Sequence, residues 1–188
     1  MRKLIAAPFL TLDGYVAGAN GDMSWNIDVF NDEMGQWITN LYENSDTIVL
    51  GRVTYQEFLG FWPGADNDAD PMAKTMNTTP KIVFSTTLDD VEWGTYDKPT
   101  LIRDNVVDQV NKLKAQDGKN MVIVGSARLV QSLLNLGVID ELHLMIHPTI
   151  VGDGKCLYEN ISKKIQLDLA KSDTFKNGVV TLEYKVKG

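Results

Sequence analysis

The stretch Thr47-Ile48-Val49-Leu50-Gly51-Arg52-Val53-Thr54-Tyr55 points to the fold class, because an apolar run passes through a glycine into a polar and aromatic segment. An apolar run without alternation is typical of a strand covered on both faces, as in parallel α/β sheets. Short helical turns are expected after this run, with Thr54 as the candidate cap and Arg52 offering a planar fork of donors for a phosphate. The stretch therefore predicts a buried strand, a tight exit at Gly51 and the start of a short helix.

A second stretch, Val122-Ile123-Val124-Gly125-Ser126-Ala127-Arg128, also runs from an apolar segment into small residues. Small residues let a phosphate approach the backbone where the helix dipole is positive. In an open α/β sheet, ligands bind beyond the carboxyl ends of the strands, which is where both junctions are expected. Taken singly, each junction fits an ordinary tight turn equally well, and neither a GxGxxG nor a Walker sequence is present.

The rest of the chain continues the alternation of strands and helices. Further apolar runs predict strands at 4–10, 81–84, 121–124, 141–150 and 179–186. Apolar stripes at helical spacing predict helices over about 31–43, after a cap at Asp104, and over 129–134 up to Gly137. The last two apolar runs alternate, so they are expected as antiparallel strands near a sheet edge, whereas 61–79 is expected as a loop. The predicted fold class is α/β, with a mixed, mainly parallel central sheet flanked by helices and a C-terminal antiparallel hairpin.

Composition narrows the class of protein. The chain has 188 residues, 18 Lys+Arg and 25 Asp+Glu, so its formal net charge is −7. The length fits a single domain over residues 1–188, and the acidic balance argues against general binding of nucleic acid or anionic membranes. The apolar run at 4–10 is short for a signal peptide and lacks a cleavage site, and no stretch approaches the ~18 apolar residues of a membrane span. We therefore expect a cytoplasmic protein.

Metal and thiol chemistry are not expected. Cys156 is the single cysteine, which excludes an internal disulfide and a thiolate cluster. His143 and His147 stand four apart in a β pattern, where this spacing corresponds to about 13 Å, so structural histidines are favoured over a metal site. The acidic run at Asp66, Asp68 and Asp70 lacks the glycine and glutamate of a calcium loop.

Four motifs in order resemble a known fold family. The segment 47–55 resembles the strand-Gly-Arg-x-Thr-aromatic segment of dihydrofolate reductases, and 121–134 resembles their glycine-rich strand-to-helix turn. The chain looks still closer to the reductase domain of riboflavin biosynthesis and its stand-alone relatives. That likeness rests on Thr11-Leu12-Asp13-Gly14-Tyr15-Val16-Ala17-Gly18 with Asn20-Gly21 and Trp25, and on Glu141 to Pro148 followed by Gly152-Asp153-Gly154-Lys155. Together the motifs span residues 3–186.

The resemblance implies an NADPH site. Arg52 would face the 2′-phosphate, which would favour NADPH over NADH, and Arg103 would border the adenine side. The other implied contacts are Gly51, Thr54, Ser85 and Thr86 toward the adenosine phosphates, Gly125, Ser126, Ala127 and Arg128 at the pyrophosphate, and Ala7 with the loop from Asp13 to Gly18 beside the nicotinamide. Within that loop, Gly14 and Gly18 would give freedom to close.

The resemblance also implies an activity, which is the reduction of a small heterocyclic substrate with NADPH. Dihydrofolate reductases supply a carboxylate from the first helix, and Asp32 is the nearest match, with Asp13 a comparable candidate for substrate contact. Trp25 would line the substrate pocket. The expected substrate is similar to 5-amino-6-(5-phosphoribosylamino)uracil or dihydrofolate, and homodimers are implied as well. A protein that binds NADP(H) or a flavin without turnover stays open as the alternative.

Overall fold

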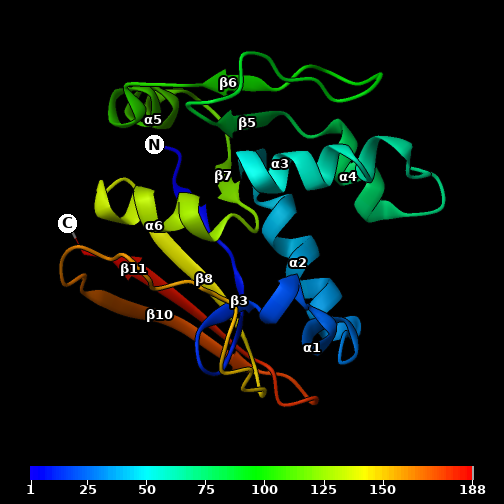
Figure 1. Ribbon diagram of the computed structural model, residues 1–188, viewed down its shortest axis with the longest axis vertical. Coiled ribbons are helices and arrows are strands. Elements are labelled where there is room, and N and C mark those ends of the chain that lie inside the picture. The colour runs from blue at the N-terminus through cyan, green and yellow to red at the C-terminus, as the bar shows by residue number, and fades with distance from the viewer. Residues whose placement is uncertain (188) are drawn as a thin grey trace.

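A mixed nine-stranded sheet runs through the molecule, in a computed structural model that describes residues 1–187 (Figure 1). Its centre is parallel, in the order β1 (Leu4–Ala6), β7 (Asn120–Ile123), β4 (Ser45–Gly51), β5 (Lys81–Phe84) and β6 (Thr100–Ile102). On the other side of β1 the sheet continues through β8 (Glu141–His147) and β11 (Val180–Val186) to the edge strand β10 (Leu167–Thr174). Since β8 pairs parallel with β1 and antiparallel with β11, the sheet is mixed, as predicted.

The first apolar run forms two strands instead of one. After β1, the chain bends at Ala7 and Pro8 and continues as β2 (Phe9–Thr11), which also pairs with β8. Proline cannot donate a ladder hydrogen bond, which explains why the strand is interrupted there. The following strand β3 (Tyr15–Ala17) leaves the main sheet and pairs with β9 (Lys155–Cys156).

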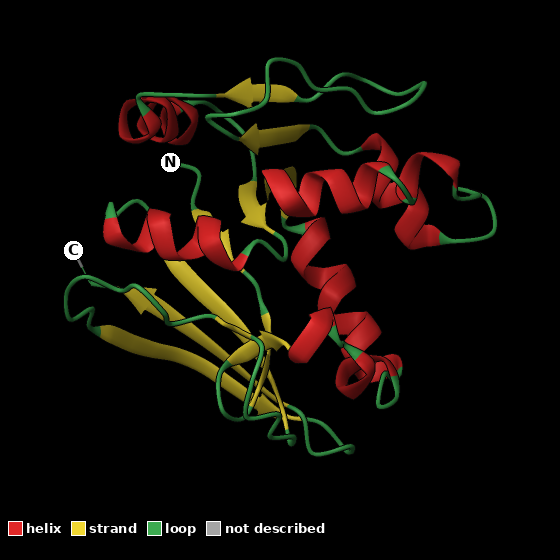
Figure 2. Cartoon of the chain, in the orientation of Figure 1, coloured by secondary structure: helices red, strands yellow, loops and turns green. Residues whose placement is uncertain are grey.

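Helices cover both faces of the parallel strands (Figure 2). α5 (Val106–Ala115) and α6 (Ala127–Asn135) pack on one face, whereas α2 (Asp32–Glu43), α3 (Arg52–Leu59) and α4 (Pro71–Thr78) pack on the other. Within β4 the side chains alternate between the two faces of the sheet. Val49 belongs to the core under α5 and α6, and Ile48 and Leu50 belong to the core under α3 and α4. Each such buried aliphatic side chain stabilises the fold by roughly 1.5–3 kcal/mol. Among residues 1–187, no helix is long and apolar enough to cross a membrane.

Three further local predictions were wrong. The segment 61–79 is not all loop, because it holds the short 3-10 turn Trp62–Gly64 and α4, which Asp70 caps through the Met72 N–H and which buries Met76. The cap of α5 is Asn105, in a left-handed conformation, and not Asp104. Thr54 does not cap α3 but lies inside it. The expectation for the two alternating runs is confirmed, since they form the antiparallel strands β8 and β11 near the edge of the sheet, where β10, whose sequence is mostly polar, is the edge strand.

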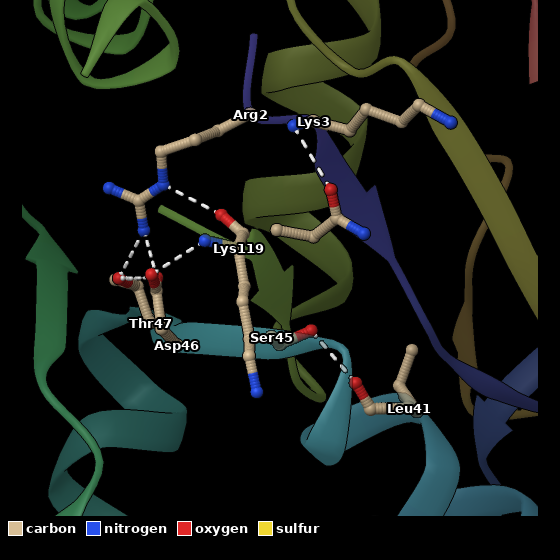
Figure 3. Close-up of polar contacts among 8 residues, drawn as sticks. Arg2, Lys3, Leu41, Ser45, Asp46, Thr47 and Lys119 are labelled. Atoms are coloured by element: carbon tan, nitrogen blue, oxygen red, sulfur yellow. Dashed lines mark hydrogen bonds and ion pairs between the residues drawn. The ribbon is translucent and has the colours of Figure 1, made fainter. Parts of the chain in front are cut away.

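A buried polar cluster ties the amino ends of β1, β4 and β7 together (Figure 3). The Arg2 guanidinium is ion-paired with Asp46 and donates to the Thr47 hydroxyl at 2.7 Å and the Lys119 carbonyl at 2.7 Å. The Asp46 carboxylate also accepts from the Lys119 N–H at 2.8 Å. The buried guanidinium is tolerated because its Nε and one terminal nitrogen are hydrogen-bonded and Asp46 balances its charge, so this cluster is a structural clamp at the amino ends of the parallel strands, opposite the candidate site.

Candidate functional site

The predicted cofactor residues gather along one edge of the sheet. Because β1, β7, β4, β5 and β6 are parallel and adjacent, their carboxyl ends lie side by side. The residues that follow these ends are Ala7 after β1, Gly125 to Arg128 after β7, Gly51 to Thr54 at the end of β4, Ser85 and Thr86 after β5, and Arg103 after β6. In an open α/β sheet, ligands bind beyond the carboxyl ends of the parallel strands, and the predicted residues lie at these ends.

The junctions after β4 and β7 are joined by two hydrogen bonds. The Gly51 N–H donates to the Ser126 hydroxyl at 2.9 Å, and the Ser126 N–H donates to the Thr54 hydroxyl at 3.1 Å. From β4 the chain crosses over one face of the sheet toward β5, and from β7 it crosses over the other face toward β8. The joined junctions therefore lie at the point where the crossovers diverge, which is the usual ligand crevice of such sheets.

Glycine at 125 is required by the backbone. Gly125 and Ser126 both have left-handed conformations, with φ of 56° and 59°. A Cβ on Gly125 would lie 3.1 Å from the Thr54 methyl group and 3.3 Å from its hydroxyl. At Gly51, by contrast, φ is −84°, so this glycine is required by the close approach of Leu129 and Ser126 and not by a special turn. The predicted tight exit at Gly51 is thus a close packing of two chain segments.

Two helices begin at these junctions without a side-chain cap. α3 starts after Gly51 and α6 after Ser126, and in neither helix does the capping residue's side chain accept from the first turn. The Ser126 hydroxyl is instead the acceptor for Gly51. Helix first turns without a side-chain acceptor, together with the positive end of the helix dipole at both starts, make this pair of junctions suited to an anion.

Two arginines add positive charge at the same place. Arg52 and Arg128 are exposed in the first turns of α3 and α6, and neither forms an ion pair within residues 1–187. Arg52 donates to the Gln56 side chain at 3.1 Å, an exposed contact within its own helix. Both guanidinium groups are therefore available for a phosphate.

Two of the residues predicted to contact the cofactor after β5 and β6, Ser85 and Arg103, already have partners within the protein. The Ser85 hydroxyl accepts from the Thr87 and Leu88 N–H groups at 3.2 and 3.1 Å, so it stabilises its own turn, whereas Thr86 is exposed. Arg103 is ion-paired with Asp89 at 3.0 Å, on the surface. Surface pairs of this kind contribute little to stability, so a ligand could displace Asp89 from Arg103.

The loop that holds Asp13 is tied to the segment after β8. The Asp13 carboxylate accepts from the Thr11 hydroxyl at 2.6 Å and from the Gly152 N–H at 2.8 Å, and the β3–β9 ladder continues the connection. The hydrogen bond from Thr11 is the main cause that lowers the pKa of Asp13, and the backbone bonds act in the same direction. A carboxylate held in this way is a poor proton donor. Its geometry is that of a residue that positions the loop, and closure of this loop through Gly14 and Gly18 stays a prediction.

Trp25 is largely buried, and its place in a substrate pocket stays a prediction. It is 7% exposed, its indole N–H donates to the Asp22 carbonyl at 3.2 Å, and its ring packs edge-on against His147 at 4.8 Å between centroids. His147 is fully buried and its Nδ1 donates to the Leu10 carbonyl at 3.2 Å, while burial lowers its pKa. Sequence reasoning placed His147 on one face of its strand but did not anticipate this packing, which only the fold brings about.

The helix α2 presents Asp32 at its first turn. Asn31 caps the helix by accepting from the Met34 N–H at 3.0 Å, so Asp32 is the first helical residue and is exposed. The neighbouring Glu33 accepts from the Lys176 N–H at 2.9 Å, which ties the helix to the β10–β11 turn. Asp32, which has no such bond within residues 1–187, is the freer carboxylate of the two.

The fold places the chain among dihydrofolate-reductase-like proteins. It is similar to a putative riboflavin biosynthesis protein from Shewanella sp. PV-4, with a TM-score of 0.82 and 26% identity over 99% of each chain. A pyrimidine reductase-like protein from Corynebacterium diphtheriae gives a TM-score of 0.67 at 18% identity over 100% of this chain and 92% of that one. Dihydrofolate reductase from Enterococcus faecalis gives 0.63 at 13% identity over 99% and 97%. The last two likenesses concern the fold alone.

The sequence narrows this class to a family. The chain is 33% identical over 189 residues to the uncharacterised protein YyaP of Bacillus subtilis, which covers 100% of this chain and 96% of that protein. The family model of the RibD C-terminal domain matches residues 2–181. The protein belongs to the RibD C-terminal domain family, which confirms the resemblance noted in the sequence.

Proposed function

We propose that the protein is an NADPH-dependent reductase of a small heterocyclic substrate. The observation that carries the proposal is the pair of uncapped helix starts, α3 and α6, joined through Gly51, Ser126 and Thr54 at the carboxyl edge of the sheet. Membership of the RibD C-terminal domain family supports it, since a fold neighbour from Thermotoga maritima is a 5-amino-6-(5-phosphoribosylamino)uracil reductase fused to a deaminase, at 13% identity.

The residues present fit the dinucleotide. Its pyrophosphate would lie against the first turn of α6, close to Gly125, where a side chain would meet Thr54. Arg128 would neutralise part of the negative charge of the pyrophosphate. Arg52 would bind the 2′-phosphate, and Ala7 would lie beside the nicotinamide at the end of β1. NADPH, when bound, would supply the hydride; the chain aligns the reactants, excludes water and provides the proton.

Asp32 is the proposed proton donor. Its exposure at the start of α2 leaves its carboxyl free to contact a substrate, whereas the Asp13 carboxylate already accepts from Thr11 and Gly152. We expect Asp32→Asn to lower turnover while NADPH binding stays as it was, because the change removes a proton and no phosphate contact. Asp28→Asn, at a neighbouring exposed carboxylate, is the control in steady-state kinetics. An unchanged rate and pH profile for Asp32→Asn would remove Asp32 from the mechanism.

The cofactor assignment is tested by titration with NADPH and, separately, NADH. Arg52→Ala should weaken NADPH by about 1.5–3 kcal/mol, the scale of a charge-assisted hydrogen bond, or roughly 10- to 160-fold, and leave NADH nearly unchanged. Lys187→Ala serves as the control, since Lys187 forms an exposed pair with Asp168 beside β10 and β11, away from these strand ends. Equal losses for both cofactors would contradict the 2′-phosphate assignment, and no binding of either would favour the alternative of another ligand in the same crevice.

We also propose that the protein forms homodimers. The support is the resemblance to riboflavin-pathway reductases, together with the edge strand β10, whose outer side is exposed along almost its whole length. An unpaired strand edge is a common route to association between copies. Sedimentation equilibrium distinguishes the dimer from a monomer.

A further inference from the structure

An open cavity of about 230 Å³ lies at the end of α6 that is farther from the candidate cofactor crevice. The crevice is at the first turn of α6, whereas Leu134, in the last turn, borders the cavity. Leu142 near the start of β8 and Leu167 at the start of β10 form another part of the wall. The segment 157–166, which joins β9 to β10, contributes the rest. Nothing in the proposed reductase function uses these residues.

The wall of this cavity is mostly apolar. Leu134 and Leu142 are buried, whereas Ile161, Ile165 and Leu167 are half-buried and border the open space. Apolar surface in a concave place is typical of a site for a small molecule, because the ligand removes this surface from water. The cavity therefore favours the apolar part of a ligand.

Two cations border the same cavity. Lys163 and Lys164 are exposed, the chain bends at Lys163, and neither lysine forms an ion pair within residues 1–187. No carboxylate is among the described residues that line the cavity. Of the carboxylates close by in the sequence, Asp168 pairs with Lys187 at 2.7 Å and Glu159 is exposed outside the lining. The rim of the cavity is therefore positive, in a chain whose net charge is −7.

The segment that carries the two lysines is held on both sides of them. The Asn135 side chain donates to the Asn160 carbonyl at 2.8 Å and accepts from the Ser162 N–H at 2.9 Å. Beyond the lysines, the Lys187 N–H donates to the Gln166 carbonyl at 2.9 Å. The protein itself therefore holds this wall in place, which lowers the cost of ordering it when a ligand binds.

The end of α6 opposes an anion only weakly. The carbonyl groups of Leu133 and Leu134 accept from the N–H groups of Val138 and Gly137, at 3.2 and 3.1 Å. Because these bonds occupy carbonyl groups at the negative end of the helix dipole, that end is partly neutralised. The two lysines therefore dominate the charge at the cavity.

We propose that this cavity binds a small amphipathic anion, a carboxylate with an aliphatic tail. The tail lies against Leu142, Ile165 and Leu167, and the carboxylate lies beside the ammonium groups of Lys163 and Lys164. If a carbon atom takes about the space of a water, about 30 Å³, the cavity holds a tail of roughly seven or eight carbon atoms. The alternative is that the lysine stems only cover the apolar wall, with no ligand.

Octanoate is the probe, and calorimetry with the full chain measures its saturable binding. Lys163→Gln together with Lys164→Gln should weaken octanoate about threefold to tenfold, because each exposed charge pair contributes up to about fivefold. Lys74→Gln together with Lys112→Gln is the control, since both lysines are exposed outside the lining and the net charge changes equally. This control should bind octanoate as the wild type does.

The position of the ligand is tested without any change of charge. Nuclear Overhauser effects should connect the octanoate tail to the methyl groups of Ile161 and Ile165, which Ile161→Val and Ile165→Val assign. Ile165→Trp should abolish octanoate binding, because the larger side chain fills the cavity. Urea denaturation of Ile165→Trp shows that this variant is folded.

Three outcomes would overturn the proposal. They are absence of saturable binding at millimolar octanoate, equal binding of the neutral analogue octanamide, and equal binding by wild type and the variant without Lys163 and Lys164. Self-association that Ile165→Trp abolishes, without octanoate binding, would assign the cavity to a contact between copies and would overturn the proposal as well. NADPH titration in parallel separates this result from the reductase proposal, since none of the variants changes a residue at the carboxyl edge of the sheet.

Discussion

Substitution of Gly125 by alanine tests the geometry of the crevice most directly. The left-handed φ of 56° costs an alanine roughly 1–2 kcal/mol. The added Cβ would also lie 3.1 Å from the Thr54 methyl group, which must then move by a few tenths of an ångström. Overpacking of this kind adds about 1 kcal/mol at the lower end of its range. The free energy of unfolding should therefore fall by about 2–3 kcal/mol.

Two further variants separate the two contributions. Gly137 has a φ of 69° and open space where a Cβ would lie, so Gly137→Ala should cost the backbone part alone, about 1–2 kcal/mol. Thr54→Ser removes the methyl group but keeps the hydroxyl that accepts from the Ser126 N–H, so Gly125→Ala should cost less in this background. The difference should be about 0.5–1 kcal/mol of coupling, as found for residues in contact.

Urea denaturation of the four variants measures these energies, and NADPH titration measures the functional part. Gly125→Ala should weaken NADPH because the Cβ would push apart the Gly125 and Thr54 segments that join the two helix starts, and Gly137→Ala should leave NADPH binding unchanged. Two results together would refute the close approach between Gly125 and Thr54. They are equal destabilisation by Gly125→Ala and Gly137→Ala, and the same cost of Gly125→Ala in the Thr54→Ser background as in the wild type. Unchanged NADPH binding by a folded Gly125→Ala would refute the phosphate assignment.

Two further predictions concern buried charges. Burial lowers the pKa of Lys81 to about 8, and its ammonium lies 4.5 Å from the Trp93 ring centre, so the folded state binds fewer protons than the unfolded state between about pH 8 and 10.5. Stability should rise with pH across this window, and Lys81→Met should flatten the rise in urea denaturation at several pH values. Asp46→Ala leaves the Arg2 guanidinium buried without its carboxylate and should cost about 2 kcal/mol, between the ranges for exposed and buried pairs. Asp89→Ala, in an exposed pair, should cost less than about 0.5 kcal/mol by the same measurement, and a similar loss for both would contradict the clamp.

The central fold could be predicted because its strands are buried on both faces. Runs such as 47–50 and 121–124 are continuous and apolar, and their glycine-containing ends fixed where the helices would start. α2 was predicted to within a residue, since its apolar stripe and the cap at Asn31 agree. The order of the elements along the chain followed from these runs and from the apolar stripes between them.

The errors arose where tertiary contacts outweigh local pattern. β10 is exposed along almost its whole length and mostly polar, so no hydrophobic signal marks it, and its pairing with β11 alone makes it a strand. α4 begins inside a segment rich in Pro, Gly and Asp, and it is helical because Asp70 and Pro71 start it and Met76 is buried. Position 54 looked like a cap, but the Thr54 hydroxyl is used by Ser126, 72 residues away.

The candidate site was predictable in position but not in detail. The strand ends gave the side of the sheet where the predicted residues gather, and the residue types there are the basis for the anion site that we propose. The roles of individual side chains could not be read in this way, since the partners of Asp13 and Arg103 are distant in sequence or on other elements. Asp13 and Asp32 have the same side chain, and only the fold shows that one is bonded and the other free.

The connection between the Asp13 loop and the segment after β8 also constrains how the two loops can vary. The Leu12 N–H donates to the Thr149 carbonyl at 2.8 Å, and the Leu157 N–H donates to the Gly14 carbonyl at 2.9 Å. The backbone of each loop therefore holds the other in its conformation. An insertion in 12–18 would shift the register of the β3–β9 ladder unless 149–157 changed length to match. Exchange of loops between relatives should therefore succeed in pairs and fail singly, although more than 130 residues separate the two segments in the chain.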